Sequence, residues 1–253
     1  MKLNIYPFSE HPELEDSFWS DDLMAAWPAF MLEDPIANLI YADKRFERFL
    51  EFCLVAVDET NPSEVLARAV SVPFCLGEEF RRPELPDGGW DTVVRWADQD
   101  AFLDRTPNAV SALEILVHPK VASQGISGQM LAAMRANAKR LGFKDLYAPV
   151  RPSHKHLGPH TPMNEYAFRT REDGLPVDPW LRVHVRTGGS IVKVAPCSMT
   201  IVGTLEQWRE WTDLPFKESG EVIVPKALVP VHASVEQNHA VYVEPNVWVQ
   251  HVL

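Results

Sequence analysis

The clearest pattern of apolar and polar positions along the chain lies between Ser111 and Gly142. Residues 112–117 form an apolar run that predicts a strand, and the run stops at His118-Pro119. After a short polar loop, apolar residues recur with the period of one helical face, and Gly142 follows where a helix commonly ends. The positions on that face are Ile126, Met130, Leu131, Met134, Ala138 and Leu141. A strand, a loop and a helix N-terminus in this order direct free backbone N–H groups at one point, which suits a phosphate or pyrophosphate.

Before this unit the pattern predicts helices first and then a pair of strands. The expected elements are an irregular arm at 1–12, two short helices within 13–32, a helix at 43–50, strands at 52–57 and 65–74, and a helix at 92–103. Pro28 separates the two opening helices because proline breaks the helical hydrogen-bond ladder. Asp91 is a suitable N-cap for the helix that precedes the central strand.

Behind the unit the pattern alternates between strands and helices and then becomes rich in strands. The expected elements are a strand at 146–150, a short helix within 163–171, a helix at 179–186, strands at 190–194 and 198–202, a helix at 205–211, and apolar runs at 222–224, 229–231 and 242–252. Asp178-Pro179 marks a helix start, and Thr204 can cap the helix that follows it. This order of elements predicts an α+β fold with a mixed sheet wrapped on both faces.

The charge and composition restrict the classes of partner. The chain has 253 residues, 24 Lys and Arg against 35 Asp and Glu, and a net charge of −11. An acidic surface argues against nucleic acid and leaves room for a cationic substrate such as an amine. Apolar runs are too short to span a bilayer, and the first residues lack the pattern of a secretory signal. Cys53, Cys75 and Cys197 are far apart and odd in number, which favours a reducing, cytoplasmic location.

The strand–loop–helix unit resembles the acyl-CoA-binding motif of the GNAT acetyltransferase superfamily. In that motif a strand ends V-x-P, a loop reads Q/R-x-x-G-x-G/A, and a helix opens with aliphatic residues. Val117-His118-Pro119 matches the strand end, and Gly125 matches the first loop glycine, where a side chain would obstruct a pyrophosphate. Ala122 and Ser127 depart from the motif. The resemblance implies a GNAT-like α+β fold, with a mixed, mostly antiparallel central sheet flanked by helices.

The C-terminal part resembles a subgroup of actinobacterial-type GNAT proteins with a C-terminal extension. The segments REDGLPVDPWLR and YVEPNVWVQH carry this resemblance, which implies no defined substrate. We therefore expect a GNAT-like acyl-CoA-binding domain at residues 1–195. Residues 196–253 are expected to form a β-rich extension packed on the same domain. The extension could cover the sheet, line the substrate pocket or form a homodimer interface.

The resemblance also implies where acetyl-CoA or CoA would bind as a co-substrate. By position in the motif, the backbone of Leu116 and Val117 would hold the pantetheine arm and the thioester carbonyl. The loop and the first helical turn would hold the pyrophosphate. The residues expected there are Gln124, Gly125, Ile126, Ser127 and Gly128.

Two residues are candidates for acid–base chemistry. Glu114 is a carboxylate within an apolar strand, and in several GNAT enzymes a Glu near this point is the general base, directly or through water. The alternative is a Glu that faces solvent or forms a structural ion pair. His184 stands where the superfamily often has the Tyr that reprotonates the CoA thiolate, and a helix C-terminus would favour its protonated form. The alternative is a packing or surface histidine beside Trp180, one helical turn back.

No metal site is expected, because His154, His156 and His160 lie in a loop without nearby Cys or Glu partners. The resulting hypothesis is an acyltransferase that moves an acetyl or other acyl group from acyl-CoA to an amine of a small molecule or peptide. The amine would attack directly, without a covalent enzyme intermediate. The alternatives are a non-catalytic acyl-CoA-binding module, or an acyl-CoA enzyme with another outcome, such as thioester hydrolysis or O-acyl transfer.

Overall fold

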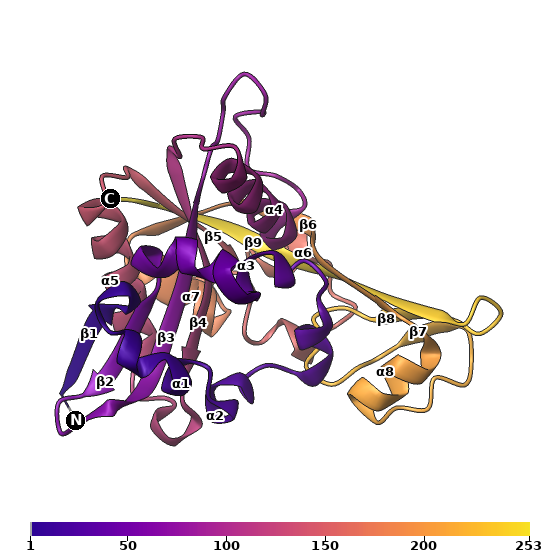
Figure 1. Cartoon of the computed structure of the whole chain (residues 1–253). Helices are drawn as coiled ribbons and strands as arrows, with labels where there is room; N and C mark the ends of the chain where they lie inside the picture. Colours follow the sequence, from indigo (N-terminus) through magenta and orange to yellow (C-terminus); the bar gives the residue numbers. More distant parts are fainter. Residues whose placement is uncertain (1) are drawn as a thin grey trace.

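The computed structural model describes residues 2–253, whose strands form a single sheet. The sheet order is β1-β2-β3-β4-β5-β9-β8-β7, and β6 pairs with β9 off this path (Figure 1). The strands are β1 (Leu3–Pro7), β2 (Leu54–Asp58), β3 (Asn61–Phe74), β4 (Ala109–Val117), β5 (Asp145–Val150), β6 (Gly189–Gly203), β7 (Gly220–Val222), β8 (Val231–Ser234) and β9 (His239–Val252). Among these pairs only β4 and β5 run parallel. The predicted α+β class with a mixed, mostly antiparallel sheet is confirmed.

Helices cover both faces of the sheet. They are α1 (Glu15–Phe18), α2 (Asp21–Met24), α3 (Asn38–Tyr41), α4 (Gly89–Phe102), α5 (Ile126–Arg140), α6 (Met163–Tyr166), α7 (Pro179–Arg186) and α8 (Leu205–Thr212), with 3-10 segments that include η3 (Ala29–Glu33) and η4 (Asp43–Phe52). No helix within residues 2–253 has both the length and the apolar character that crossing a bilayer requires.

Alternation along the strands divides the core into two clusters. In β2, Val55 and Val57 face the cluster under α4, α8 and the N-terminal helices, whereas Leu54 and Ala56 face the cluster under α5, α6 and α7. Successive side chains of a strand point to opposite faces, so a strand with apolar residues on both faces must be covered twice. The strands therefore have near-continuous apolar runs in the sequence because the sheet is buried between two helical layers.

The N-terminal arm and the start of α4 differ from prediction. Residues 3–7 form β1, which pairs antiparallel with β2, and Pro7 is tolerated because it is the last residue of an edge strand. Helix α4 begins at Gly89, ahead of the predicted cap Asp91. The Asp91 carboxylate instead accepts a hydrogen bond from the Thr200 N–H of β6, 3.2 Å away.

The C-terminal strands are interleaved with the rest of the sheet. Strand β6 runs without a break from Gly189 to Gly203, where two separate strands were predicted, and the expected boundary at residue 195 falls inside it. Strand β9 lies between β5 and β6. Figure 1 shows β7, β8, α8 and the adjoining end of β9 projecting together to one side.

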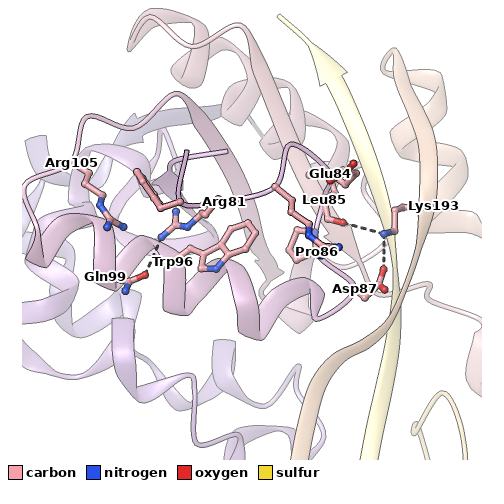
Figure 2. A pocket seen from close by; sticks show the side chains of 11 residues that line it. Arg81, Glu84, Leu85, Pro86, Asp87, Trp96, Gln99, Arg105 and Lys193 are labelled. Carbon is pink, nitrogen blue, oxygen red and sulfur yellow. Dashed lines mark hydrogen bonds and ion pairs between the residues drawn. The ribbon is translucent and has the colours of Figure 1, made fainter. Parts of the chain in front are cut away.

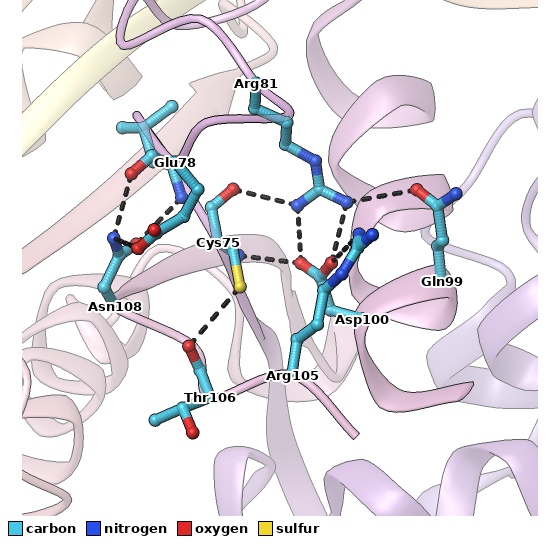
Figure 3. A network of polar contacts seen from close by, with 9 residues as sticks. Cys75, Glu78, Arg81, Gln99, Asp100, Arg105, Thr106 and Asn108 are labelled. Atoms are coloured by element: carbon cyan, nitrogen blue, oxygen red, sulfur yellow. Dashed lines mark hydrogen bonds and ion pairs between the residues drawn. The ribbon is translucent and has the colours of Figure 1, made fainter. Parts of the chain in front are cut away.

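A buried carboxylate fixes the connection between β3 and α4. Asp100 of α4 accepts hydrogen bonds from the Cys75 backbone N–H at 2.8 Å and from Arg81 Nη2 at 2.8 Å, and Arg105 Nη1 lies 3.1 Å away (Figure 3). Two guanidinium groups thus converge on one carboxylate that is almost wholly buried. This network holds the irregular segment 75–88 against α4.

Candidate active site

The parallel strands β4 and β5 separate partway along their length. They pair only at Val110 with Leu146 and at Ser111 with Tyr147. Beyond these positions, residues 112–117 of β4 and 148–150 of β5 line the same cavity, whose volume is about 870 Å³. The edge of β4 that faces β5 therefore offers backbone groups that β5 does not pair. Such an edge can hold an extended ligand by main-chain hydrogen bonds.

A bulge in β4 lies at the point of separation. Val70 of β3 pairs with Glu114, but the next residue, Ser71, pairs with Ala112, so Leu113 is an additional residue on β4. Bulges of this kind change the direction of neighbouring side chains. Leu113 packs in the core, and Glu114 lines the cavity.

The start of α5 has the features of an anion site. Ser123 and Gly125 have φ angles of 64° and 76°, so the chain enters the helix through two left-handed residues. In the described part of the chain, the N–H groups of Ile126, Ser127 and Gly128 have no backbone acceptor, as expected for a first helical turn. A Cβ added to Gly125 would meet no atom within 4 Å, so space is open beside these N–H groups.

The predicted residues are arranged around this opening in different ways. Leu116, Val117, Ser127, Glu114 and His184 all line the cavity. The Ile126 side chain is buried in the core, so this residue can offer only its backbone N–H to a ligand. Gln124, Gly125 and Gly128 adjoin Ser127 in sequence at the helix start, and the Gln124 side chain is exposed.

Glu114 is held in a buried ion pair. Arg68 Nε on β3 lies 2.9 Å from Glu114 Oε1, and Trp27 Nε1 donates to Glu114 Oε2 at 3.2 Å. The side chains of Arg68 and Glu114 are 1% and 5% exposed. The guanidinium carbon of Arg68 lies over the rings of Phe18 and Trp19, at 4.7 and 4.9 Å from their centroids. The carboxylate is therefore fixed in direction at the wall of the cavity.

His184 is buried and neutral. Its Nδ1 lies 3.0 Å from Nε2 of His251 on β9, and its ring stacks edge-on against Trp180 at 4.6 Å. Burial, with a smaller contribution from His251, lowers the pKa of His184 to about 3. The prediction that the helix C-terminus favours protonated His184 is therefore wrong, because the loss of hydration on burial outweighs the effect of the helix dipole. A neutral imidazole remains at the cavity wall.

A second polar network at the cavity was not predicted. Glu244 of β9 is fully buried, and its two oxygens accept from Arg151 Nε, at 3.1 and 2.9 Å. The same carboxylate accepts from the Tyr242 hydroxyl at 2.7 Å and from Asn246 Nδ2 at 3.0 Å. Arg151 also donates to the Lys226 carbonyl. Tyr242, Glu244 and Asn246 alternate along β9, but Arg151 is 93 residues from Glu244, so no local pattern indicated that they would meet.

The histidines of the loop after β5 are not gathered. His156 lines the cavity, whereas His154 and His160 do not. Within the described residues no group of three or more His, Cys, Asp or Glu side chains is placed to hold a metal ion.

A smaller cavity of about 580 Å³ lies between the segment 80–87, α4 and Lys193 of β6 (Figure 2). Figure 2 shows Lys193 reaching the Leu85 carbonyl and the Asp87 carboxylate, at 3.1 and 2.5 Å. None of the predicted site residues lines this cavity. The larger cavity at β4 and β5 is therefore the candidate active site.

The chain is similar to known proteins in sequence and in fold. No protein-family model matches the chain. The arginine N-acetyltransferase avaD of Aspergillus versicolor is 32% identical to it, over 95% of this chain and 90% of that protein.

Two solved structures share the fold over 100% of this chain. The loading GNATL domain of CurA from Lyngbya majuscula has a TM-score of 0.55, with 17% identity over 98% of that chain. The GphF GNAT-like decarboxylase in complex with isobutyryl-CoA has a TM-score of 0.51, with 16% identity over 99% of that chain. Identities at this level establish the fold, and the fungal relative establishes the family. The chain belongs to the GNAT superfamily of acyl-CoA-dependent N-acetyltransferases.

Proposed function

We propose that this enzyme transfers an acetyl group from acetyl-CoA to an amine of arginine or of an arginine-containing compound. The observation that carries the proposal is the single cavity that joins the separated edge of β4, the Glu114 carboxylate and the start of α5. The name of the fungal relative, an arginine N-acetyltransferase, supports the choice of acceptor. The GphF GNAT-like decarboxylase, which shares the fold, is in complex with isobutyryl-CoA, and this supports an acyl-CoA as donor.

The chain has suitable groups for each part of acetyl-CoA. The N–H groups from Gly125 to Gly128, with the side chain of Gln124, would bind the pyrophosphate at the positive end of α5. The backbone of Leu116 and Val117, on the edge of β4 that β5 does not pair, would bind the pantetheine arm and orient the thioester carbonyl. Bound in this way, acetyl-CoA supplies the electrophilic carbonyl carbon.

Glu114 is the proposed general base. An aliphatic amine is protonated at neutral pH and must lose a proton before its nitrogen can attack. The Glu114 carboxylate, held by Arg68 and Trp27, would accept that proton directly or through one water. The attack forms a C–N bond, and collapse of the tetrahedral intermediate breaks the C–S bond.

The cavity wall suits a cationic acceptor with an apolar stem. Aromatic rings are its most distinctive feature, because an indole or phenol face attracts a guanidinium. The rings that line it are those of Trp19, Trp27, Tyr41, Trp90 and Trp180. The carboxylate of Glu114 adds negative charge at the same wall, although Arg68 balances it.

Direct attack is supported by the positions of the thiols. Cys53 and Cys75 are buried, Cys197 is exposed, and none of the three lines the cavity. Burial raises the pKa of the Cys53 thiol far above its ordinary value and so removes the reactive thiolate. The chain thus offers no cysteine for a covalent acyl-enzyme at this site.

The test combines binding and turnover with the same protein. Isothermal titration with acetyl-CoA and CoA measures binding, and CoA release with mass spectrometry of the amine measures transfer to arginine, ornithine and lysine. We expect CoA binding and acetylated arginine. CoA binding without turnover would identify a binding module, and CoA release without an acetylated amine would identify a thioester hydrolase. Absence of CoA binding at high micromolar ligand would overturn the whole proposal.

Three finer expectations remain predictions. They are membership of the actinobacterial-type subgroup, a cytoplasmic location and a homodimer. The fungal relative supports the superfamily and does not bear on the subgroup.

A further inference from the structure

Two buried histidines from different elements meet at the wall of the active-site cavity. His184 of α7 and His251 of β9 are 2% and 0% exposed, and their facing nitrogens, Nδ1 and Nε2, are 3.0 Å apart. The backbone packs tightly around the pair. A Cβ at Gly189 would lie 2.7 Å from His251 Cε1 and 2.8 Å from the His184 carbonyl oxygen. The relative position of the two rings is therefore fixed by the fold.

The pair consists of two neutral rings, which allows two arrangements of protons. Burial lowers the pKa of His184 to about 3 and that of His251 to about 4. In each neutral ring one nitrogen carries the proton and the other is an acceptor. In the first arrangement His184 Nδ1–H donates to His251, and the His251 proton must then reside on Nδ1. In the second, His251 Nε2–H donates to His184 Nδ1, and His251 Nδ1 is unprotonated and has a free lone pair.

The surroundings of His251 Nδ1 favour the second arrangement. This nitrogen is buried and has no hydrogen-bond partner among the described residues. A buried N–H without an acceptor carries the full desolvation cost of a donor. Arg135 of α5 lies beside the ring, where it donates to the carbonyls of Thr187 and Val252, and its charge contributes to the lowered pKa of His251. A nearby cation stabilises a lone pair and opposes an N–H dipole.

We propose that His251 is a positioning residue that fixes the tautomer of His184, so that His184 presents its Nε2–H to the cavity as a hydrogen-bond donor. This inference rests on the proposed function, because the group that would accept the bond is the sulfur of the leaving CoA thiolate. As the C–S bond breaks, negative charge develops on that sulfur, and a donor fixed in advance stabilises it. His184 keeps its proton throughout. The proton that finally converts the thiolate to a thiol is the one released by the amine, delivered through Glu114 or water.

The matched variants His251→Gln and His251→Leu test the positioning role. The Gln amide nitrogen takes nearly the place of histidine Nε2 and can donate to His184 Nδ1, whereas Leu cannot. We expect His251→Leu to lower kcat by roughly 10-fold or more, as loss of one oriented hydrogen bond to a charged group predicts. The KM of the amine and the affinity for CoA should stay unchanged. His251→Gln should restore kcat to within about 3-fold of wild type.

Nitrogen NMR of the wild-type protein, labelled at its nine histidines, tests the tautomer without any substitution. The His184 signals, assigned by their loss in His184→Phe, should show a protonated Nε2 and an unprotonated Nδ1. A His184 proton on Nδ1, or equal kcat values for folded His251→Leu and His251→Gln, would overturn the inference. If wild type acetylates no amine, the proposed function fails, while the NMR experiment still decides the tautomer.

Discussion

Arg68 Nε lies 2.9 Å from Oε1 of Glu114, and both side chains are almost wholly enclosed by the N-terminal helices. This ion pair joins β3 and β4 at the bulge where β4 turns away from β5. It also links the proposed base to the N-terminal segment, through the 3.2 Å hydrogen bond from Trp27 Nε1 to the other Glu114 oxygen. The direction of the carboxylate is therefore set within the protein itself, by Arg68 and Trp27.

Replacing Glu114 with Gln should impair catalysis more than binding. The amide keeps an acceptor for Trp27 but cannot take a proton, so kcat should fall by about 10²- to 10⁴-fold. Titration with CoA should give an affinity close to wild type, since the contacts proposed for the cofactor do not include Glu114. The change also leaves the Arg68 charge unpaired, so the assay should be run at a temperature well below the midpoint of thermal unfolding of the variant. An unchanged kcat would exclude Glu114 as the base.

Replacing Arg68 with Met should destabilise the fold. The change leaves a buried carboxylate without its partner, and such losses cost about 3–5 kcal/mol. Urea unfolding of the single variant, compared with that of the double variant Arg68→Met/Glu114→Gln, measures the cost of leaving the Glu114 charge without its partner. The double variant should recover a large part of the loss, because no buried charge remains. Equal destabilisation of the two proteins would show that Arg68 acts through packing on Phe18 and Trp19 alone.

Gly125 and Gly142, at opposite ends of α5, form a matched pair for testing the pyrophosphate site. Both have positive φ angles, 76° and 91°, and a Cβ at either position would meet no atom within 4 Å. Replacement by Leu should therefore destabilise the protein similarly at both positions, by about 1–2 kcal/mol. Only Gly125→Leu places a side chain beside the free N–H groups of the first turn. Calorimetry should detect loss of CoA binding in that variant alone, and equal affinities would place the pyrophosphate elsewhere.

Local signals predicted the parts of the fold that depend on neighbouring residues. Asp178 accepts from the N–H groups of Trp180 and Leu181, and Thr204 forms a reciprocal capping box with Gln207, as the cap positions indicated. Strand β1 was missed because its five residues are all half-buried and give no clear apolar alternation. The place of β9 between β5 and β6 is a long-range pairing that no local pattern records.

The same division holds for the active site. The loop before α5 and the lone carboxylate Glu114 in an apolar strand could be recognised from the sequence. Their partners could not, because Arg68, Trp27 and His251 lie 46, 87 and 67 residues from the groups that they bind. One signal was available, since Arg68 is a single charged residue within the apolar strand predicted at 65–74. A buried charge of this kind requires a partner, although the sequence does not show which one.

Asp34 and Asp91 should make the stability of the fold depend on pH. Both carboxyls are buried, and each has one oxygen, Asp34 Oδ2 and Asp91 Oδ1, without a partner among the described residues. Burial, reinforced by the charge of Asp34, raises the pKa of Asp91 from 3.8 to about 8, and burial also raises the pKa of Asp34. A proton shared between the two carboxyls would satisfy both oxygens.

The direction of the effect follows from proton binding. Between about pH 4 and about pH 8 the folded protein holds a proton on this pair that the unfolded chain has released, so the contribution of the pair to stability falls as pH rises through this range. Asp91→Asn removes the ionisation and can still donate to Asp34, and should flatten the dependence. Urea unfolding at a series of pH values measures how stability depends on pH. The exposed Asp213→Asn is the control, and its stability should change with pH as that of wild type does. Because His184 and His251 take up protons on unfolding below about pH 7, the Asp91 contribution is measured between about pH 7 and about pH 8. A wild-type protein whose stability stays level or increases over that interval would contradict the shared proton.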